Sequence, residues 1–471
     1  MENVSTYTPL GSTDALIWPG MSMPLPEDQE VWCTKAEEFR GLWYANTPLD
    51  SPYRYKYSGG LGTYCCKHRS MAIYSARADK TFFVWGGRDT DGAVDEPAVL
   101  SNARGAGQAL HMISWYDHAT KRLGEPITLF DKWNPDAHDN PTLTIDDAGF
   151  IWVFSPSHGT ATTPSFALRS REPLSLADGF ERVLTTFFSY PQPWNIPGKG
   201  LALMHTQYEE WRRFLAVSRS EDGRSWSAPQ FLAKVERGHY QVSEACGQCI
   251  VTAFDFHPMQ GGLERRTNLY ILRSGDGGAT WTTMDGRPVV LPLVDSVNPA
   301  LVRDYRAEGR LVYLKDVAFD AKGHPAVLYI TSRVHESGPE NGPREWTIAH
   351  WIGATWVYHA VTTSDNNYDH GELYIESDGT WRIIGPTEPG PQPFNPGGEV
   401  AMWTSRDTGC TWRRERLMTA GSPRNHTYVR RPVHAHPDFY AFWADGHGRE
   451  PSPSDLYYCN NAGDVTRMRR G

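Results

Sequence analysis

Two histidines in the first third of the chain are well suited by type and position to proton transfer. His118 ends the apolar run HMISWYDH, and His138 follows twenty residues later in DAHDNPTL. An imidazole has a reference pKa of about 6.5, so it can take or give a proton near neutral pH. Aspartates flank both rings, at Asp117 and Asp139. The alternative is that either ring caps a turn or bonds a backbone carbonyl.

Tyr190, in the segment FFSYPQPW, is the third candidate. A positioned phenol can deliver a proton to a departing oxygen atom. Two histidines at successive strand ends, followed by this tyrosine, favour a functional interpretation over turn capping. We therefore predict that His118, His138 and Tyr190 surround one cavity.

The segments that position these side chains are short and rich in β-forming residues. Apolar runs such as TFFVWGG, FIWVFSP, NLYILR and VAMWTS alternate with clusters of Gly, Asp, Asn and Pro, and aromatic residues make up 12% of the chain. Aromatic rings fit a pleated, half-buried surface. Short strands at even spacing with turn signals between them indicate an all-β sandwich, barrel or propeller.

A repeated turn sequence favours the propeller among these all-β folds. The template S-x-D-x-G-x-T-W occurs at 274–281 and 405–412, and a shortened copy occurs at 220–226. In such a turn the Asp accepts backbone N–H groups, the Gly adopts a positive φ and the Trp packs beneath. This is the Asp-box turn of many β-propellers, and it indicates fold and not function.

The length of the chain then suggests the number of blades and the domain boundaries. At about 40–50 residues per blade, the chain suits a propeller of seven or more blades. We expect an N-terminal extension, residues 1–40, that packs on a single β-propeller domain, residues 41–471.

Charge and hydropathy exclude several classes of partner. The formal net charge is −9 at pH 7 and the arginine clusters are short, so the basic stripe of a nucleic-acid-binding protein is missing. No apolar run approaches the ~20 residues of a membrane helix. The first residues do not form a signal peptide, which leaves a cytoplasmic protein or a secreted or periplasmic protein with its leader removed. The oligomeric state stays open.

The motifs YKYSGGLGTYCCKH, DAHDNPTL, FSYPQPW, SDNNYDHGELYI and NHTYVRRPVHAHPDFYAFWADG resemble those of the BNR-4-repeat polysaccharide lyases, a group that includes ulvan lyases and rhamnose–glucuronate lyases. The resemblance begins at about Gly41 and covers nearly all of the remaining chain. It implies a seven-bladed propeller that acts on an anionic poly- or oligosaccharide. It also implies a site of two His, a Tyr and an Arg, in which His118, His138 and Tyr190 match the first three.

The reaction that the resemblance implies is a β-elimination at a uronic acid. The enzyme removes the C5 proton and expels the sugar on O4, which leaves an unsaturated uronate. The C5 proton becomes acidic only when the neighbouring carboxylate is neutralised. On this basis His138 or His118 serves as the base, the other histidine helps to hold the carboxylate, and Tyr190 serves as the acid.

The chain departs from the family where a Thr-Arg-Tyr or Thr-Lys-Tyr is expected, because Gln207 replaces the cation. Glutamine can bond a carboxylate but cannot neutralise it, so Arg212, Arg213 or Arg266 would have to compensate. His239 and Tyr240 in GHYQVS are further candidates for the pocket wall, with a buried strand turn as the alternative. The predicted substrate-binding residues are Asn140, Gln207, Arg213, His239, Tyr240 and Arg266.

The predicted reaction requires no cofactor, but the sequence leaves room for a structural calcium or zinc ion. Cys246 and Cys249 form a C-x-x-C motif with His239 and His257 nearby, a set that could bind zinc. The alternative is two partly buried thiols in a hairpin. A second group of histidines, which we interpret mainly as packing and turn-capping residues, comprises His426, His434 and His436.

Two other functions remain open at this stage. A sialidase-like glycoside hydrolase needs paired carboxylates at a set separation, and the available carboxylates are Asp139, Glu244, Asp369 and Glu399. A non-catalytic sugar-binding propeller would keep its aromatic residues without needing the two histidines and the tyrosine. The products distinguish the three functions, because a lyase gives an unsaturated uronate, a hydrolase gives only new reducing ends and a binding protein gives neither.

Overall fold

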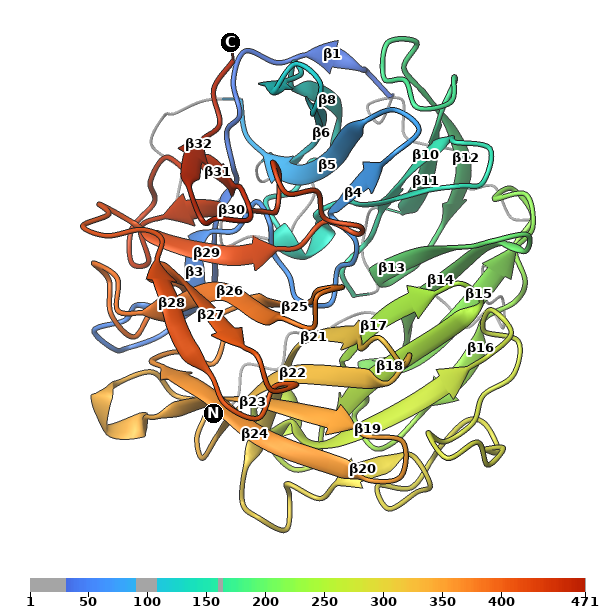
Figure 1. The fold of residues 1–471 in the computed structure, drawn as a ribbon, viewed down its shortest axis with the longest axis vertical. Coiled ribbons are helices and arrows are strands. Elements are labelled where there is room, and N and C mark those ends of the chain that lie inside the picture. Colours follow the sequence, from blue (N-terminus) through green and yellow to red (C-terminus); the bar gives the residue numbers. More distant parts are fainter. Residues whose placement is uncertain (1–30, 90–107, 160–163, 471) are drawn as a thin grey trace.

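Seven antiparallel sheets are arranged as blades around a central axis in the computed structural model, which describes residues 31–89, 108–159 and 164–470 (Figure 1). The predicted all-β, seven-bladed propeller is therefore confirmed. Within the described residues the helical segments are three short 3₁₀ turns, η1 (Ala137–Asp139), η2 (Gly262–Arg265) and η3 (Pro339–Asn341). None of the helical segments in this part of the chain is long and apolar enough to cross a membrane.

The strands follow one another around the ring in sequence order. The first blade contains β1 (Thr34–Lys35), β4 (Ala72–Ser75), β5 (Lys80–Gly87), β6 (Leu110–Asp117), β7 (Arg122–Leu123) and β8 (Ile127–Asp131). The second contains β9 (Thr142–Ile145), β10 (Ile151–Ser155), β11 (Ser165–Ser170) and β12 (Phe180–Thr186). The third contains β13 (Ser189–Ile196), β14 (Gly200–Glu209), β15 (Arg212–Ser220) and β16 (Gln230–Ala233).

The remaining four blades have four strands each. The fourth contains β17 (Gln241–Cys246), β18 (Cys249–Phe256), β19 (Thr267–Ser274) and β20 (Leu301–Arg303). The fifth contains β21 (Leu311–Phe319), β22 (Pro325–Ser332), β23 (Arg344–Trp351) and β24 (Trp356–Ser364). The sixth contains β25 (Glu372–Ile375), β26 (Trp381–Glu388), β27 (Glu399–Ser405) and β28 (Arg413–Leu417). The seventh contains β29 (Asn425–Arg430), β30 (Ala441–Gly446), β31 (Leu456–Cys459) and β32 (Val465–Arg467).

Inner and outer strands of a blade differ in burial because only the inner ones are covered by neighbouring blades. Seven of the eight residues of β5 are buried, including Phe83, Val84 and Trp85. The outer strand β28 is exposed along its whole length and carries the charged sequence RRERL. Charged side chains on such an edge oppose pairing with another chain.

The repeated turns make the contacts that their sequence predicts. The backbone N–H groups of Ala279 and Thr280 donate to the carboxylate of Asp276, at 3.0 and 2.9 Å. The indole N–H of Trp281 donates to the carbonyl of Gly278, whose φ is +88°. The turn at Asp276 follows the last residue of β19, whereas Arg266 precedes its first residue, at the opposite end of the blade.

A separate hairpin, β2 (Trp43–Pro48) with β3 (Tyr55–Gly60), precedes the first blade and contacts β29 and β30 of the seventh blade. Before it, β1 pairs with β8, and Phe39 is buried against the first blade. Residues 1–30 of the predicted N-terminal extension lie outside the described residues. The part that is described packs on the first blade.

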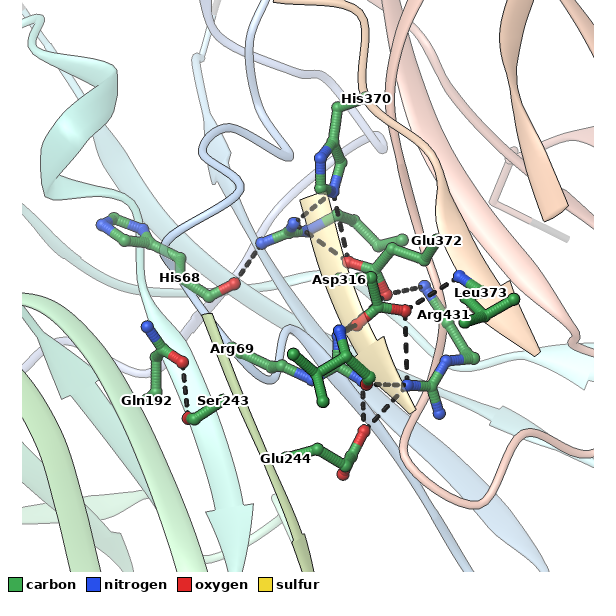
Figure 2. Close-up of polar contacts among 12 residues, drawn as sticks. His68, Arg69, Gln192, Ser243, Glu244, Asp316, His370, Glu372, Leu373 and Arg431 are labelled. Carbon is green, nitrogen blue, oxygen red and sulfur yellow. Dashed lines mark hydrogen bonds and ion pairs between the residues drawn. The ribbon is translucent and has the colours of Figure 1, made fainter. Parts of the chain in front are cut away.

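An ionic network lies at the centre of the ring, where the innermost strands meet (Figure 2). Arg69, just before β4, pairs with Glu244 on β17 and Asp316 on β21. Arg431, just after β29, binds the same two carboxylates at 2.8 and 3.4 Å. Arg430 completes the network by pairing with Glu372 on β25 at 3.1 Å. Residues from the first, fourth, fifth, sixth and seventh blades are thus joined on the axis.

Backbone hydrogen bonds also connect the first and seventh blades. Val433, which follows β29, exchanges backbone hydrogen bonds with Ala72 and Tyr74 of β4, at 2.8 and 3.0 Å. The first and seventh blades therefore contact each other through their backbones as well as through the axial charges. Removing one partner from a buried ion pair typically costs about 3–5 kcal/mol, because the other charge is left buried and uncompensated.

Candidate active site

A compact polar cavity of about 170 Å³ lies where the β2–β3 hairpin meets the second, third and fourth blades. The hairpin contributes Lys56 and Tyr57 to its wall. The segment between β3 and β4 contributes Tyr64 and Lys67. The blades and their connections contribute His138, His158, Tyr190, Arg213, Tyr240, Arg266 and Tyr368.

Tyr190 lies at the start of β13 in a backbone conformation that its residue type rarely adopts. Its φ is +52°, and the pairing of β13 with β14 shifts register between Ser189 and Gln192. Such strain persists where the surrounding structure holds it, and it is frequent at functional sites. The Tyr190 hydroxyl is buried beside the phenols of Tyr208 and Tyr240. Burial raises the pKa of this phenol well above its usual value, so it holds its proton at neutral pH.

Asp136 joins two histidines at the wall of the pocket. Its carboxylate accepts from Nδ1 of His138 at 2.5 Å and from Nδ1 of His158 at 2.8 Å. The two rings stack with their centroids 3.9 Å apart. Burial raises the pKa of the Asp136 carboxyl, but His138 and His158 outweigh that effect and hold the pKa well below its usual value. The carboxylate is therefore charged and fixes the Nδ1–H tautomer of both rings.

The opposite nitrogen of His138 faces two phenols. Its Nε2 lies 2.8 Å from the hydroxyl of Tyr57 and 2.9 Å from that of Tyr64. Burial lowers the pKa of His138 to about 4, although Asp136 acts in the other direction. At neutral pH the ring is neutral, and the lone pair on Nε2 can accept a proton.

Cations surround the phenol of Tyr240 on the other side of the cavity. The ammonium of Lys67 lies 4.4 Å from the centre of the Tyr240 ring, and the guanidinium of Arg266 lies 4.9 Å from it. Burial raises the pKa of Tyr240, but Arg213, Arg266 and Lys67 outweigh burial and bring the pKa below its usual value. This part of the pocket is thus strongly positive and suits an anionic group of a ligand.

His118 does not belong to this pocket, and the prediction that it lines one cavity with His138 is wrong. β8 lies between the two histidines and carries the chain back across the first blade. His118 follows the last residue of β6, whereas the first residue of β6 pairs with Gly87, near the hairpin. An eight-residue strand spans about 26 Å, so the two rings lie at opposite ends of the blade.

Three of the predicted substrate-binding residues do not line the cavity. The Asn140 amide donates to the carbonyls of Leu61 and Tyr64, so it positions the segment that carries Tyr64. Gln207 donates to the carbonyl of Phe187, because alternate side chains of β14 face opposite sides of the sheet. His239 is fully buried and bonded at both ring nitrogens to backbone atoms. The other three lie in the wall as predicted: Arg213, Tyr240 and Arg266.

Arg213 supplies the cation that the sequence lacks at position 207. It pairs with Tyr208 across the β14–β15 ladder, and β15 brings it into the cavity. Burial lowers the pKa of Arg213, but the phenols of Tyr208, Tyr240 and Tyr190 outweigh burial and raise the pKa above its usual value. The guanidinium therefore keeps its charge despite its burial.

The predicted cysteine–histidine zinc set does not assemble. Cys246 and Cys249 face each other at the tip of the β17–β18 hairpin. His239 and His257 flank the opposite ends of these strands, where Gln241 pairs with Phe254. His426, by contrast, contacts Ser422 and the indole of Trp443, as the packing interpretation predicts.

The carboxylates available to a hydrolase are committed elsewhere. Asp139 accepts a hydrogen bond from Asn134, and Glu244 lies in the axial network. Asp369 accepts from the backbone N–H of Gly397, and Glu399 accepts from the hydroxyl of Ser422. None of these four residues is in the wall of the cavity. The described residues around the pocket thus offer phenols, imidazoles and cations, without a pair of carboxylates at its surface.

The sequence reasoning missed His158, Asp136 and the two tyrosines that face His138. His158 lies two residues after the end of the run FIWVFSP, so it stands near a strand end, as His118 and His138 do. Asp136 lies two residues before His138 and caps η1. Tyr57 and Tyr64 lie in the motif YKYSGGLGTYCCKH, which indicates the family but assigns no role to either tyrosine.

A larger groove of about 1160 Å³ lies around the turns at Asp222 and Asp276, at the other end of the blades. Both aspartates are occupied by the backbone N–H groups of their own turns. The lining of this groove includes neither histidine nor tyrosine. The smaller cavity is therefore the better candidate for chemistry.

Comparison with known proteins adds a family assignment. Residues 107–374 match the BNR_4 family, described as BNR repeat-containing family member. The chain is 20% identical over 253 residues to Ulvan Lyase-PL25 of Pseudoalteromonas sp. (strain PLSV), an alignment that covers 47% of this chain and 52% of that protein. It is 21% identical over 352 residues to the ulvan lyase of Nonlabens ulvanivorans, covering 65% and 72%. The chain thus spans about half the length of the first of these relatives.

The fold has a counterpart among solved structures. A polysaccharide lyase PL25 ulvan lyase bound to -[GlcA(1-4)Rha3S]- superposes with a TM-score of 0.68 at 16% identity, over 94% of this chain and 98% of that one. At this level of identity the likeness concerns the fold alone.

Proposed function

We propose that this chain, which belongs to the BNR repeat-containing BNR_4 family, is a polysaccharide lyase that breaks the glycosidic bond at O4 of a uronic acid by β-elimination. The observation that carries the proposal is the pocket itself, in which buried cations lie opposite a protonated phenol and a neutral imidazole. The proposed substrates are ulvan-like and other rhamnose–glucuronate glycans, because the named relatives are ulvan lyases.

Binding of the uronate carboxylate is the task of the positive wall. Arg213 and Arg266 are cations in a largely buried cavity, and Lys67 lies beside them. Charged donors in such a site stabilise the negative charge that develops when C5 loses its proton, because little water competes with them. Tyr240 packs against Lys67 and Arg266 and helps to hold them in place.

Proton transfer is the task of His138 and Tyr190. Asp136 holds the proton on Nδ1 of His138, so Nε2 is the atom that accepts the C5 proton. The hydroxyls of Tyr57 and Tyr64 occupy Nε2 when no substrate is bound, and such contacts rearrange in the complex. Tyr190 keeps its proton and lies in the wall of the cavity, so its hydroxyl is the donor to the departing O4.

The same pocket argues against the two alternatives. A hydrolase would need a carboxylate pair to protonate the leaving oxygen and to attack or activate water, and the four candidate carboxylates lie outside the cavity wall. A binding protein would need no strained tyrosine that keeps its proton in the wall of the pocket. Both features favour catalysis by elimination.

The test is to incubate the purified chain with ulvan, gum arabic, pectin, alginate and glycosaminoglycans. We expect ultraviolet absorbance from an unsaturated uronate to grow with ulvan or another rhamnose–glucuronate glycan. New reducing ends without that absorbance would identify a hydrolase. Retention on an immobilised glycan with no product at all would identify a binding protein, and either result would overturn the proposal.

A further inference from the structure

The seam between the first and seventh blades contains a second group of histidine and aspartate side chains. His118 follows β6 of the first blade, while His436 and Asp438 lie in the connection between β29 and β30 of the seventh. One ligand atom from each residue lies within 4.8 Å of the other two. The two imidazole rings have their centroids 3.8 Å apart, and the ring of Tyr74 flanks both.

His118 has a buried nitrogen atom that no neighbouring group satisfies. Its Nε2 lies 2.8 Å from the hydroxyl oxygen of Thr81, which can accept the Nε2 proton. Among the described residues its Nδ1 is buried without a hydrogen-bond partner, and the side chain as a whole is 6% exposed. A buried polar atom without a partner costs free energy, so the lone pair of this nitrogen lacks a hydrogen-bond donor or a cation.

We propose that His118, His436 and Asp438 bind a zinc ion. Zinc takes imidazole nitrogen and carboxylate oxygen at about 2.0–2.2 Å, usually with tetrahedral geometry. Tetrahedral bonds of that length place ligand atoms roughly 3.3 Å apart. Small side-chain rotations would bring the three ligand atoms, now within 4.8 Å of one another, to that separation. Three protein ligands leave the fourth position to water. His436 and Asp438 are half-buried, which gives the ion a route from solvent.

The surroundings of the site favour a cation. An imidazole binds a metal ion in its neutral form, through the lone pair of the nitrogen that carries no proton. Besides Asp438, the carboxylates of Asp79 and Asp117 lie near His118. Asp79 and Asp117 therefore add negative charge beside the ligands. Lys121 lies 3.9 Å from Asp438 but is largely exposed.

The pocket cluster of Asp136, His138 and His158 is a poorer metal site, although its residue types are the same. There each imidazole donates Nδ1–H directly to the carboxylate, at 2.5 and 2.8 Å. Hydrogen bonds of that length leave no space for an ion between the ligand atoms. At the seam the Asp438 carboxylate makes no hydrogen bond to either ring among the described residues, and only its backbone N–H contacts Nδ1 of His436.

Zinc at the seam would connect segments from opposite ends of the chain. Beside the site, the first and seventh blades are joined by two backbone hydrogen bonds at Val433 and by ring contacts such as that of Phe83 with Phe439. A ligand that binds the folded state alone shifts the unfolding equilibrium toward the folded state. The bound ion would therefore stabilise the closed ring.

The experiment uses the full chain, freed of metal with a chelator and then titrated with zinc chloride. We expect calorimetry to find one zinc ion per chain and a melting temperature that rises with zinc concentration. The site variants are His436→Ala and Asp438→Asn, both at half-buried positions, because His118→Ala at a buried position could fail to fold. Each should weaken zinc binding at least tenfold and remove the rise in melting temperature.

Two controls make the result specific to these ligands. His434→Asn changes an exposed histidine two residues from His436 and should bind zinc like the wild type. His158→Ala disrupts the pocket cluster and should also retain the zinc site, which cobalt substitution can check through its visible absorption. No zinc binding by the wild type, full binding by His436→Ala, or loss of binding in His158→Ala alone would each overturn the proposal.

Discussion

The pocket cluster and the seam cluster contain the same two residue types and differ in how they are connected. At the pocket one buried carboxylate binds the Nδ1–H of both His138 and His158, which directs each Nε2 away from it. At the seam the Asp438 carboxylate stands apart from the rings, and Nδ1 of His118 has no partner among the described residues. The first arrangement prepares an imidazole to accept a proton, whereas the second leaves an imidazole lone pair for a metal.

Residue type and burial alone therefore do not determine the chemical role of a histidine. His118 and His138 are both buried, and burial lowers the pKa of both to about 4. What separates them is the neighbouring group, which is a charged carboxylate for His138 and the Thr81 hydroxyl for His118.

The largest effect should come from removing the proton-transfer groups of the pocket. We expect His138→Ala and Tyr190→Phe each to reduce kcat by about 10²–10⁴-fold, or roughly 3–5 kcal/mol of barrier, because a positioned acid or base is lost. The measurement is the rate of unsaturated product formation on the best substrate. Tyr240→Phe is the matched tyrosine variant and should be milder. A larger loss in Tyr240→Phe than in His138→Ala would move the role of base to Tyr240.

The axial network is the next test, because it holds the ring that positions both clusters. Arg69→Met leaves Glu244 and Asp316 with one cation fewer, so we expect a loss of about 3–5 kcal/mol in the free energy of unfolding. Urea denaturation followed by tryptophan fluorescence measures this. Arg413→Met on the exposed strand β28 is the control and should change stability by less than about 0.5 kcal/mol. Equal stability of the two variants would contradict the prediction.

A smaller effect should follow from changing the carboxylate behind His138. A neutral His138 is required as base, so kcat/KM should fall as pH drops through about 4. Asp136 raises the pKa of His138, so Asp136→Asn should move this acid limb to lower pH and reduce the rate by about 10–100-fold. A pH–rate profile of both proteins is the measurement. An acid limb that moves to higher pH would show that Asp136 acts differently.

The smallest effect should come from Gln207→Ala. The side chain donates to a backbone carbonyl outside the cavity, so we expect kcat and KM within about twofold of the wild type. Arg213→Gln is its counterpart inside the cavity and should reduce kcat/KM by at least tenfold, because the carboxylate loses a charged partner. A large decrease in kcat/KM of Gln207→Ala would show that Gln207 contributes to substrate binding after all.

Local patterns in the sequence determined the fold and one half of the site. Short apolar runs between turn residues, with the repeated S-x-D-x-G-x-T-W turn, predicted the all-β propeller, because these patterns reflect strand and turn geometry within a few residues. The motifs around His138 and Tyr190 identified the two residues to which we assign proton transfer. Each of these predictions depended on a pattern contained within one short segment of the sequence.

The tertiary structure decided which strand ends share a face. Adjacent strands of an antiparallel blade run in opposite directions, so one additional strand moves a residue to the other end of the blade. β8 lies between His118 and His138 in the chain and leads back to the other end of the first blade, so the two histidines are separated. His118 lies beside His436, whereas His158, after β10, reaches His138. Arg213 replaces the missing cation of position 207 in the same way, through a neighbouring strand. The sequence named the kinds of side chain, and the direction of each strand decided their partners.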